Sequence, residues 1–283
     1  MNEIPADRYN AHPGITKSAI CAARIEDGVV SMAHMRAEML RDRDDADATE
    51  AMQRGTLAHA ALLEPTALAG RCALWEGESK RGKAWAEFKA DAESAGKIIA
   101  TPAVLARLRA MGEAVRQHSV ARGLVGSVER TEVGIEWTDR DYGLAKGRPD
   151  AIGRDLLVEY KTSRTICKRW FMSDCRRRGY HIGLAWYWHG LGRPDRVYLL
   201  NQESAEPYSC ACYRVDVGQI LEPAYDEAAR IATQYRICEG LGEGGAGIFA
   251  GPYPEMMTFE LPAFAGGDWE VGKDDDETEG DMP

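Results

Sequence analysis

In the stretch from Pro149 to Lys161, two of the acids and the lysine have types and a spacing that could do chemistry. Asp150 follows the proline, and Glu159 precedes the lysine by two positions. Residues 156–161 alternate between an apolar face and a face that carries Glu159 and Lys161, which predicts a strand. Two carboxylates and an amine at a strand end make a poor core. They suit a hard cation, because Mg²⁺ takes carboxylate oxygens as ligands.

Such a set of residues fits phosphodiester hydrolysis. The reaction needs a nucleophilic water and charge stabilisation at the phosphate, and bound divalent cations supply both. Asp150 and Glu159 are candidate metal ligands, with the Tyr160 carbonyl as a third. Lys161 would orient or deprotonate the attacking water, or neutralise charge on the phosphate. Glu136, on a neighbouring strand, would reach the metals directly or through water, whereas a surface salt bridge is the alternative explanation.

A further candidate ligand lies on a predicted helix. Thr49 is a favourable cap for a helix over residues 50–64, and Pro65 would end it. Gly55 lies inside this helix at a cost of about 1 kcal/mol relative to alanine, so we expect a close approach there. His59 lies one turn further along the same face. On local sequence alone, a core or surface histidine is the alternative.

The surrounding pattern predicts helices first and strands later. An alternating strand is expected over residues 128–137, and residues 144–148 would form its hairpin partner. Further elements are expected as helices at 83–95 and 102–118, a basic helix at 165–177, an aromatic-rich helix at 180–191, strands at 196–201 and 208–215, and an amphipathic helix at 218–238. This order predicts an α/β (α+β) class, with a central mixed sheet flanked by helices and a helical N-terminal elaboration.

The charge of the chain is unevenly distributed. Its net charge is −10, but residues 268–283 hold eight acids and one base, so −3 remains for the rest. Residues 164–178 hold six bases against one acid, beside the predicted catalytic strand. The mean charge therefore hides a basic patch. We expect the acidic end to be disordered and to aid solubility, with docking of a basic partner or competition with DNA as alternatives.

Other features exclude several classes of protein. The N-terminus lacks the basic and apolar regions of a secretion signal, and no apolar run reaches membrane-spanning length. We therefore expect a cytoplasmic protein without a membrane partner. The seven cysteines contain no CxxC pair, which argues against a zinc ribbon and favours reduced thiols.

Four motifs in order resemble the PD-(D/E)xK nuclease superfamily. They resemble in particular its branch with RecB, lambda-type exonuclease and exonuclease VIII (RecE), and most of all the exonuclease VIII-like proteins of phages and prophages. The matching residues are Gly55 to His59 as GxxxH, Glu136 on its strand, Pro149-Asp150, and Glu159-Tyr160-Lys161. Gly14 to Ser18 and Glu203 to Tyr208 add to the resemblance. The branch also carries QxxxY, of which Tyr187 matches the tyrosine, but Gly183 stands at the glutamine.

The resemblance implies a fold and a site. A restriction-endonuclease-like core would span residues 126–240, after a helical part at 1–125 and before a Gly/Pro-rich segment at 241–267 and the acidic tail at 268–283. His59 would bind a second ion of a two-ion Mg²⁺ site, with Mn²⁺ as a substitute. Arg148 and the basic helix would contact phosphates, unless they form a solvated face; the helix residues are Lys168, Arg169, Arg176 and Arg177. Thr16 and Ser18 would lie near a 5′-phosphate, and a plain helix cap explains them equally well.

The implied activity is a Mg²⁺-dependent double-stranded DNA exonuclease. It would act 5′→3′ on linear ends and serve recombination by single-strand annealing, together with an annealing protein. Relatives form rings, so we expect a trimer or tetramer. The alternatives are an iron–sulfur or structure-specific nuclease of the same superfamily and a non-catalytic adaptor. Cys210 and Cys212 lack the third close cysteine that a cluster needs. The adaptor remains an alternative because Gly183 stands in place of the glutamine.

Overall fold

The computed structural model describes residues 2–26, 28–41 and 49–241. The acidic tail and almost all of the Gly/Pro-rich segment lie outside these residues. The described part of the chain belongs to one compact unit. None of its helices is long and apolar enough to cross a membrane.

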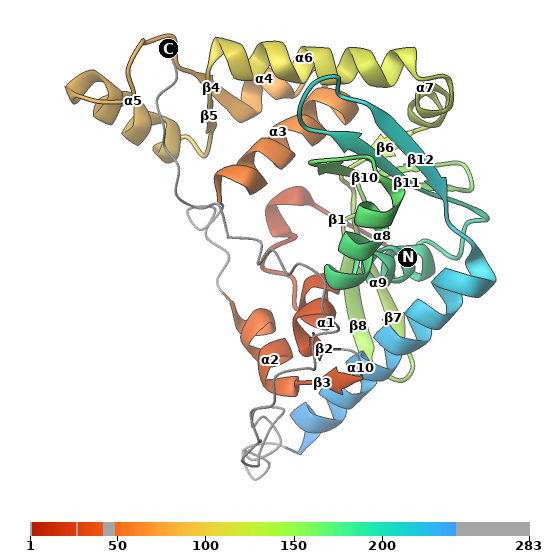
Figure 1. The fold of residues 1–283 in the computed structure, drawn as a ribbon. Coiled ribbons are helices and arrows are strands. Elements are labelled where there is room, and N and C mark those ends of the chain that lie inside the picture. Colours follow the sequence, from red (N-terminus) through yellow and green to blue (C-terminus); the bar gives the residue numbers. More distant parts are fainter. Residues whose placement is uncertain (1, 27, 42–48, 242–283) are drawn as a thin grey trace, which may run out of the picture. The chain divides into compact units, whose positions relative to one another are not determined.

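A five-stranded mixed sheet carries the central motif (Figure 1). Its order is β12 (Cys210–Arg214), β11 (Arg196–Glu203), β10 (Leu156–Ser163), β9 (Ala151–Gly153) and β6 (Arg130–Thr131). Strand β10 pairs in parallel with β11 and antiparallel with β9, so the predicted strand is confirmed and lies at the centre of the sheet. Residues 156–160 are buried, because helices cover both faces of a central strand.

A three-stranded sheet packs beside it, formed by β1 (Asn2–Ile4), β7 (Gly134–Asp139) and β8 (Gly143–Gly147). The single strand predicted over residues 128–137 is wrong. The chain breaks at Glu132, whose φ of 51° lies in the left-handed region that non-glycine residues rarely adopt. The residues before the break join the main sheet as β6, and those after it join the second sheet as β7. The break therefore lets one stretch of chain serve two sheets.

The six helices predicted above are present, with shifts at their ends. They are α3 (Glu50–Leu63), α5 (Lys83–Ser94), α6 (Pro102–Gln117), α8 (Lys168–Arg177), α9 (Tyr180–Gly190) and α10 (Glu222–Gly240). The structure also contains α1 (Lys17–Ala23), α2 (Met32–Leu40), α4 (Leu68–Arg71) and α7 (Ser119–Gly126). Short elements complete the fold: a 3₁₀ turn at Ala6–Arg8, a π turn at Val217–Leu221, and the pairs β2 (Arg24–Glu26) with β3 (Val29–Val30) and β4 (Cys72–Leu74) with β5 (Ile98–Ala100). The cap Thr49 accepts a backbone hydrogen bond as predicted, and Thr101 caps α6 in the same way.

Two apolar cores lie against the main sheet. Leu157 belongs to a core with α1, α9 and α10, whereas Leu156, Val158 and Tyr160 belong to a core with α3, α6 and α7. The alternation of β10 decides this division. Glu159 and Lys161 share the parity of Leu157 and therefore face α1 and α9. Helix α9, the predicted aromatic-rich helix, is buried over most of its length.

We expect two glycine-to-alanine changes in helices to have opposite effects. A Cβ at Gly190 of α9 would lie 2.6 Å from the ring of Trp137, so Gly190→Ala should lower the free energy of unfolding by about 1–3 kcal/mol. A Cβ at Gly123 of α7 would meet nothing within 4 Å, so Gly123→Ala should raise it by about 0.5–1 kcal/mol. Urea unfolding measures both, and equal effects would contradict this packing of α9.

Candidate metal centre

The carboxylate of Glu159 is buried beneath two lysines. Its side chain is 3% exposed. The Oε1 atom accepts hydrogen bonds from Lys161 Nζ at 2.9 Å and from Lys17 Nζ at 3.0 Å. The Oε2 atom is also buried, and no described residue gives it a hydrogen bond. A buried carboxylate oxygen without a donor is a position that a cation would fill.

Asp150 lies just before β9 and is tied to β10. Its Oδ2 atom accepts a hydrogen bond from the backbone N–H of Tyr160 at 2.8 Å and another from Lys161 Nζ at 3.2 Å. The backbone bond holds the carboxylate in place, because β10 is a rigid central strand. Asp150 and Glu159 are therefore brought together as predicted, with Lys161 between them.

The ammonium of Lys161 lies against three oxygens of the site. It contacts Asp150 Oδ2, Glu159 Oε1 and the Tyr160 carbonyl oxygen, the last at 3.0 Å. These are the three oxygens that the sequence predicts as metal ligands. They converge on one positive group, so the donor set fits a cation such as Mg²⁺.

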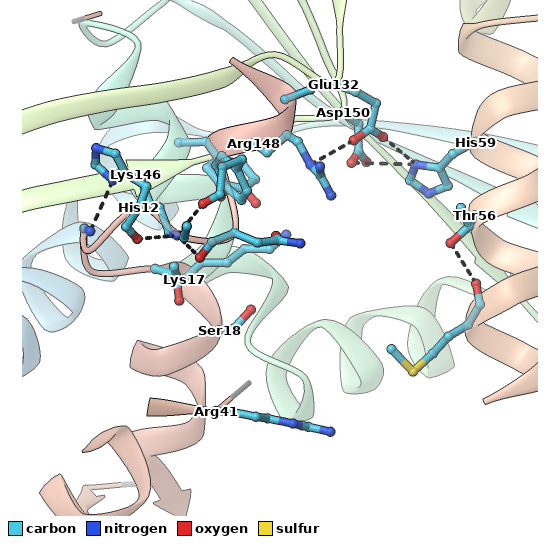
Figure 2. Close-up of a pocket in the computed structure, with 18 of the residues that line it drawn as sticks. His12, Lys17, Ser18, Arg41, Thr56, His59, Glu132, Lys146, Arg148 and Asp150 are labelled. Atoms are coloured by element: carbon cyan, nitrogen blue, oxygen red, sulfur yellow. Dashed lines mark hydrogen bonds and ion pairs between the residues drawn. The ribbon is translucent and has the colours of Figure 1, made fainter. Parts of the chain in front are cut away.

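A second group of possible ligands lies on the other side of Asp150. His59 Nδ1 is 3.6 Å from Asp150 Oδ1 and 3.6 Å from Glu132 Oε1 (Figure 2). One ligand atom from each of the three residues lies within 4.8 Å of the others. Helix α3 presents His59, and the centroid of its ring lies 4.9 Å from the centroid of the Tyr160 ring. Two carboxylates and an imidazole fit a divalent metal ion, and Asp150 is common to both groups.

The upstream acid of this group is Glu132, whereas the sequence predicts Glu136. The left-handed backbone at Glu132 and its N–H bond to the Asp150 carbonyl, at 3.1 Å, turn its side chain toward His59. Glu136 instead accepts hydrogen bonds from Asn2 Nδ2 at 3.1 Å and His12 Nε2 at 2.6 Å, and these bonds lower the pKa of its carboxyl. Its strand pairs with β1 in the other sheet. The alternating pattern gives no signal for Glu132.

The charges of the buried residues compensate one another. Burial alone would raise the pKa of Glu159, but the ammonium groups of Lys161 and Lys17 outweigh it and lower that pKa to about 2. Burial and the negative charge of Glu159 raise the pKa of Asp150. Glu159 is therefore ionised at neutral pH, and its charge depends on both lysines.

A cavity of about 1090 Å³ opens onto the second group. The segment from Tyr9 to Ser18, helix α3, and the residues Glu132, Arg148 and Asp150 contribute to its wall (Figure 2). Gly55 also lines it, and a Cβ there would meet nothing within 4 Å. No described part of the chain thus makes the close approach that Gly55 predicts, and the glycine leaves room in the cavity one turn from His59.

The predicted DNA contacts separate into two places. Arg148, Thr16 and Ser18 line the cavity. Arg148 Nε lies 3.4 Å from Glu132 Oε2, and Thr16 caps α1 by accepting from the Ala19 N–H at 3.1 Å. The basic residues of α8 are absent from the cavity wall; they are Lys168, Arg169, Arg176 and Arg177. Three of the predicted DNA contacts therefore line the same cavity as Asp150 and Glu132, whereas the four on α8 do not line it.

The position of the absent glutamine is filled by Lys17. Gly183 faces the stem of this lysine, and a Cβ at residue 183 would lie 2.9 Å from Lys17 Cδ. Tyr187, one turn further along α9, has its ring centroid 4.6 Å from Lys17 Nζ. Burial raises the pKa of the Tyr187 phenol, which therefore stays neutral. The sequence pattern gives no role to Lys17, because its contacts come from distant parts of the chain.

The cysteines do not fit an iron–sulfur cluster. All seven are free thiols, and within the described ranges no cysteine belongs to a group of three or more possible metal ligands. Burial raises the pKa of Cys210 to about 11, so this thiol is protonated at neutral pH. The donor set that an iron–sulfur nuclease would need is therefore missing from residues 2–241 as described.

Comparison with known proteins gives a likeness in fold. No family model matches the chain, and no curated protein matches it. A crystal structure from Eubacterium rectale, of a protein named as a predicted exonuclease, is similar over 92% of this chain and 97% of its own, with a TM-score of 0.56 and 11% identity. A phage-related exonuclease from Haemophilus somnus covers 82% of this chain and 97% of its own, at a TM-score of 0.34 and 12% identity.

The first of these similarities shows the class of the fold. The chain has a restriction-endonuclease-like α+β core, in which helices flank a central mixed sheet. This confirms the predicted fold class. At such low identity the likeness concerns the fold alone, so the function is argued from the site.

We expect divalent metal binding to depend on Asp150. Asp150→Asn should weaken Mn²⁺ binding by at least about 100-fold, since even groups outside the ligand shell contribute about 10–100-fold. Asparagine still accepts the Tyr160 N–H, so the fold should persist. Isothermal titration measures the affinity, and Glu136→Gln is the matched control, expected to change it by less than about 3-fold. If Glu136→Gln lost as much Mn²⁺ affinity as Asp150→Asn, the placement of Glu132 rather than Glu136 in the metal site would be contradicted.

Proposed function

We propose that this protein is a Mg²⁺-dependent exonuclease that degrades double-stranded DNA 5′→3′ from linear ends. The observation that carries the proposal is the position of Asp150, which is shared between the Glu159–Lys161 pair and the His59–Glu132 pair. Two groups of ligands around one buried carboxylate are the arrangement that a two-ion phosphodiesterase needs. The adjoining cavity contains cationic side chains that suit a phosphate backbone.

Each residue has a role in this proposal. Asp150, Glu159 and the Tyr160 carbonyl would hold one ion, and His59, Glu132 and Asp150 would hold a second. The bound ions supply a water of lowered pKa and a Lewis acid for the phosphate. Lys161 orients the attacking water or neutralises charge on the phosphate, because its ammonium already lies against both carboxylates.

The proposed DNA contacts follow the two places described above. Arg148, Thr16 and Ser18 would bind the 5′-terminal phosphate, since they line the cavity that also contains Asp150. The basic face of α8 would bind the duplex backbone away from the reacting end. We further propose a ring-shaped trimer or tetramer that works with a single-strand annealing protein, as the resemblance to exonuclease VIII-like proteins implies.

We expect Lys161→Ala to abolish degradation of linear DNA. The loss of a charged group that acts on water and phosphate should lower the rate by about 10²–10⁴-fold. The assay uses linear and closed-circular duplexes in Mg²⁺, with and without a 5′-phosphate. Lys89→Ala is the control, because Lys89 lies on α5 and its ammonium pairs with Glu93 at 3.6 Å.

The same assay separates the competing functions. We expect loss of linear duplex alone, faster with a 5′-phosphate. Cutting of closed circles by the wild-type protein would contradict the exonuclease and favour a structure-specific nuclease. Binding of DNA without cleavage in Mg²⁺ or Mn²⁺ would favour the non-catalytic adaptor.

We expect α8 to contribute to the salt dependence of DNA binding. Each phosphate contact that is removed should reduce the slope of log K against log salt by about 1. The double variant Lys168→Ala, Arg169→Ala should therefore lower the slope by about 2 in fluorescence anisotropy with Mg²⁺ omitted. The double variant Arg107→Ala, Arg109→Ala on α6 removes two other exposed arginines and should leave the slope unchanged. Equal slopes in all three proteins would contradict a duplex contact at α8.

A further inference from the structure

Lys17 is a second lysine of the site, and it comes from a different part of the chain. It begins α1 and lines the cavity, where Figure 2 shows it across from His59. Its side chain is 32% exposed, yet its ammonium reaches the buried Glu159 at 3.0 Å. The side chain thus extends from the substrate cavity to the carboxylate behind it.

The stem of Lys17 is held by two residues of α9. The absence of a side chain at Gly183 gives the stem its path, because a Cβ there would approach Cδ to 2.9 Å. The ring of Tyr187 lies beside the ammonium, with its centroid at 4.6 Å. Cation–π contacts of this kind favour a positive charge at that place. Gly183 and Tyr187 therefore fix the position of the Lys17 side chain, the first by leaving space for its stem and the second by contacting its ammonium.

Glu159 is neutralised by two ammonium groups rather than one. One carboxylate oxygen accepts from both ammonium groups, which repel each other. Lys161 has two other oxygen partners, Asp150 and the Tyr160 carbonyl. Among the described residues, Lys17 has Glu159 alone as its carboxylate partner within 4 Å, and its other polar contact is the neutral phenol of Tyr187. Lys17 is therefore the lysine that is released at lower cost when a cation binds Glu159 through its unpaired Oε2.

We propose that Lys17 is a positioning residue that exchanges with the metal. It neutralises Glu159 before a divalent cation binds, yields the carboxylate to the cation, and then contacts a phosphate group of the substrate in the cavity. The first step concerns metal binding alone. The second rests on the proposed function, since it requires a phosphodiester substrate.

A Mn²⁺ titration of the full chain tests the exchange. Lys17→Met keeps the apolar stem against Gly183 and removes the competing charge, so the dissociation constant should fall by about 10-fold. Lys17→Arg should resemble the wild type. Arg71→Met is the matched control, because Arg71 lines the same cavity but pairs with Glu64, and it should change the constant by less than about 2-fold. An unchanged constant in Lys17→Met, or an equal shift in Arg71→Met, would overturn the exchange.

A double-mutant cycle ties the effect to Glu159. In a Glu159→Gln background, Lys17→Met should leave Mn²⁺ affinity unchanged, because the carboxylate for which both cations compete is gone. Gly183→Ala offers a test that retains Lys17. The new Cβ pushes the lysine stem away from Glu159, so Mn²⁺ should bind more tightly, as in Lys17→Met. A 10-fold effect of Lys17→Met that persists without Glu159 would overturn the proposed contact.

Cleavage kinetics test the phosphate contact separately. At saturating Mg²⁺, Lys17→Met should raise KM for a 5′-phosphorylated linear duplex by about 10-fold and lower kcat less, and Lys17→Arg should restore most of the affinity. A kcat loss with unchanged KM would overturn the phosphate contact. If the wild type cleaves no DNA, the proposed function fails, while the Mn²⁺ titrations still decide the exchange.

Discussion

The site depends on the hydrogen bond between the Tyr160 backbone N–H and the Asp150 carboxylate. This bond fastens an acid from outside the sheet to the central strand β10. It leaves one oxygen of Asp150 directed to His59, while the bonded oxygen also meets Lys161. A buried carboxylate without such partners would lose its charge, because desolvation favours the neutral form. The rigid strand thus keeps the two candidate ligand groups on either side of one residue.

The second constraint is the compensation of charge around Glu159. Two lysines supply it, one from the same strand and one from α1. Gly183 has no side chain, and this leaves room for the second lysine. The departure from the QxxxY pattern at Gly183 is therefore accompanied by a cation that reaches the same carboxylate. This pairing explains how the site can lack the glutamine and still hold a buried acid.

Much of the fold follows from local features of the sequence. Thr49 and Thr101 mark the starts of α3 and α6, because a cap interacts only with its own first turn. The alternation along β10 correctly assigns Glu159 and Lys161 to one face. The basic helix begins later than predicted, at Lys168, since the residues before it form a loop in which the Ile166 N–H bonds Glu203. Such a bond joins distant residues and leaves no local pattern.

The sequence by itself indicated the grouping of Asp150, Glu159 and Lys161, the helix that carries His59, and the α+β class. Only the tertiary structure decided that Glu132 lies beside His59 while Glu136 pairs with His12. The left-handed backbone at Glu132 is unfavourable by itself, and it is offset because the residues on either side of it pair in two different sheets. The tertiary structure also brought Lys17 to Glu159. Periodicity reports which face a residue occupies within one element, whereas the contact of two charges from distant elements is set by how those elements pack.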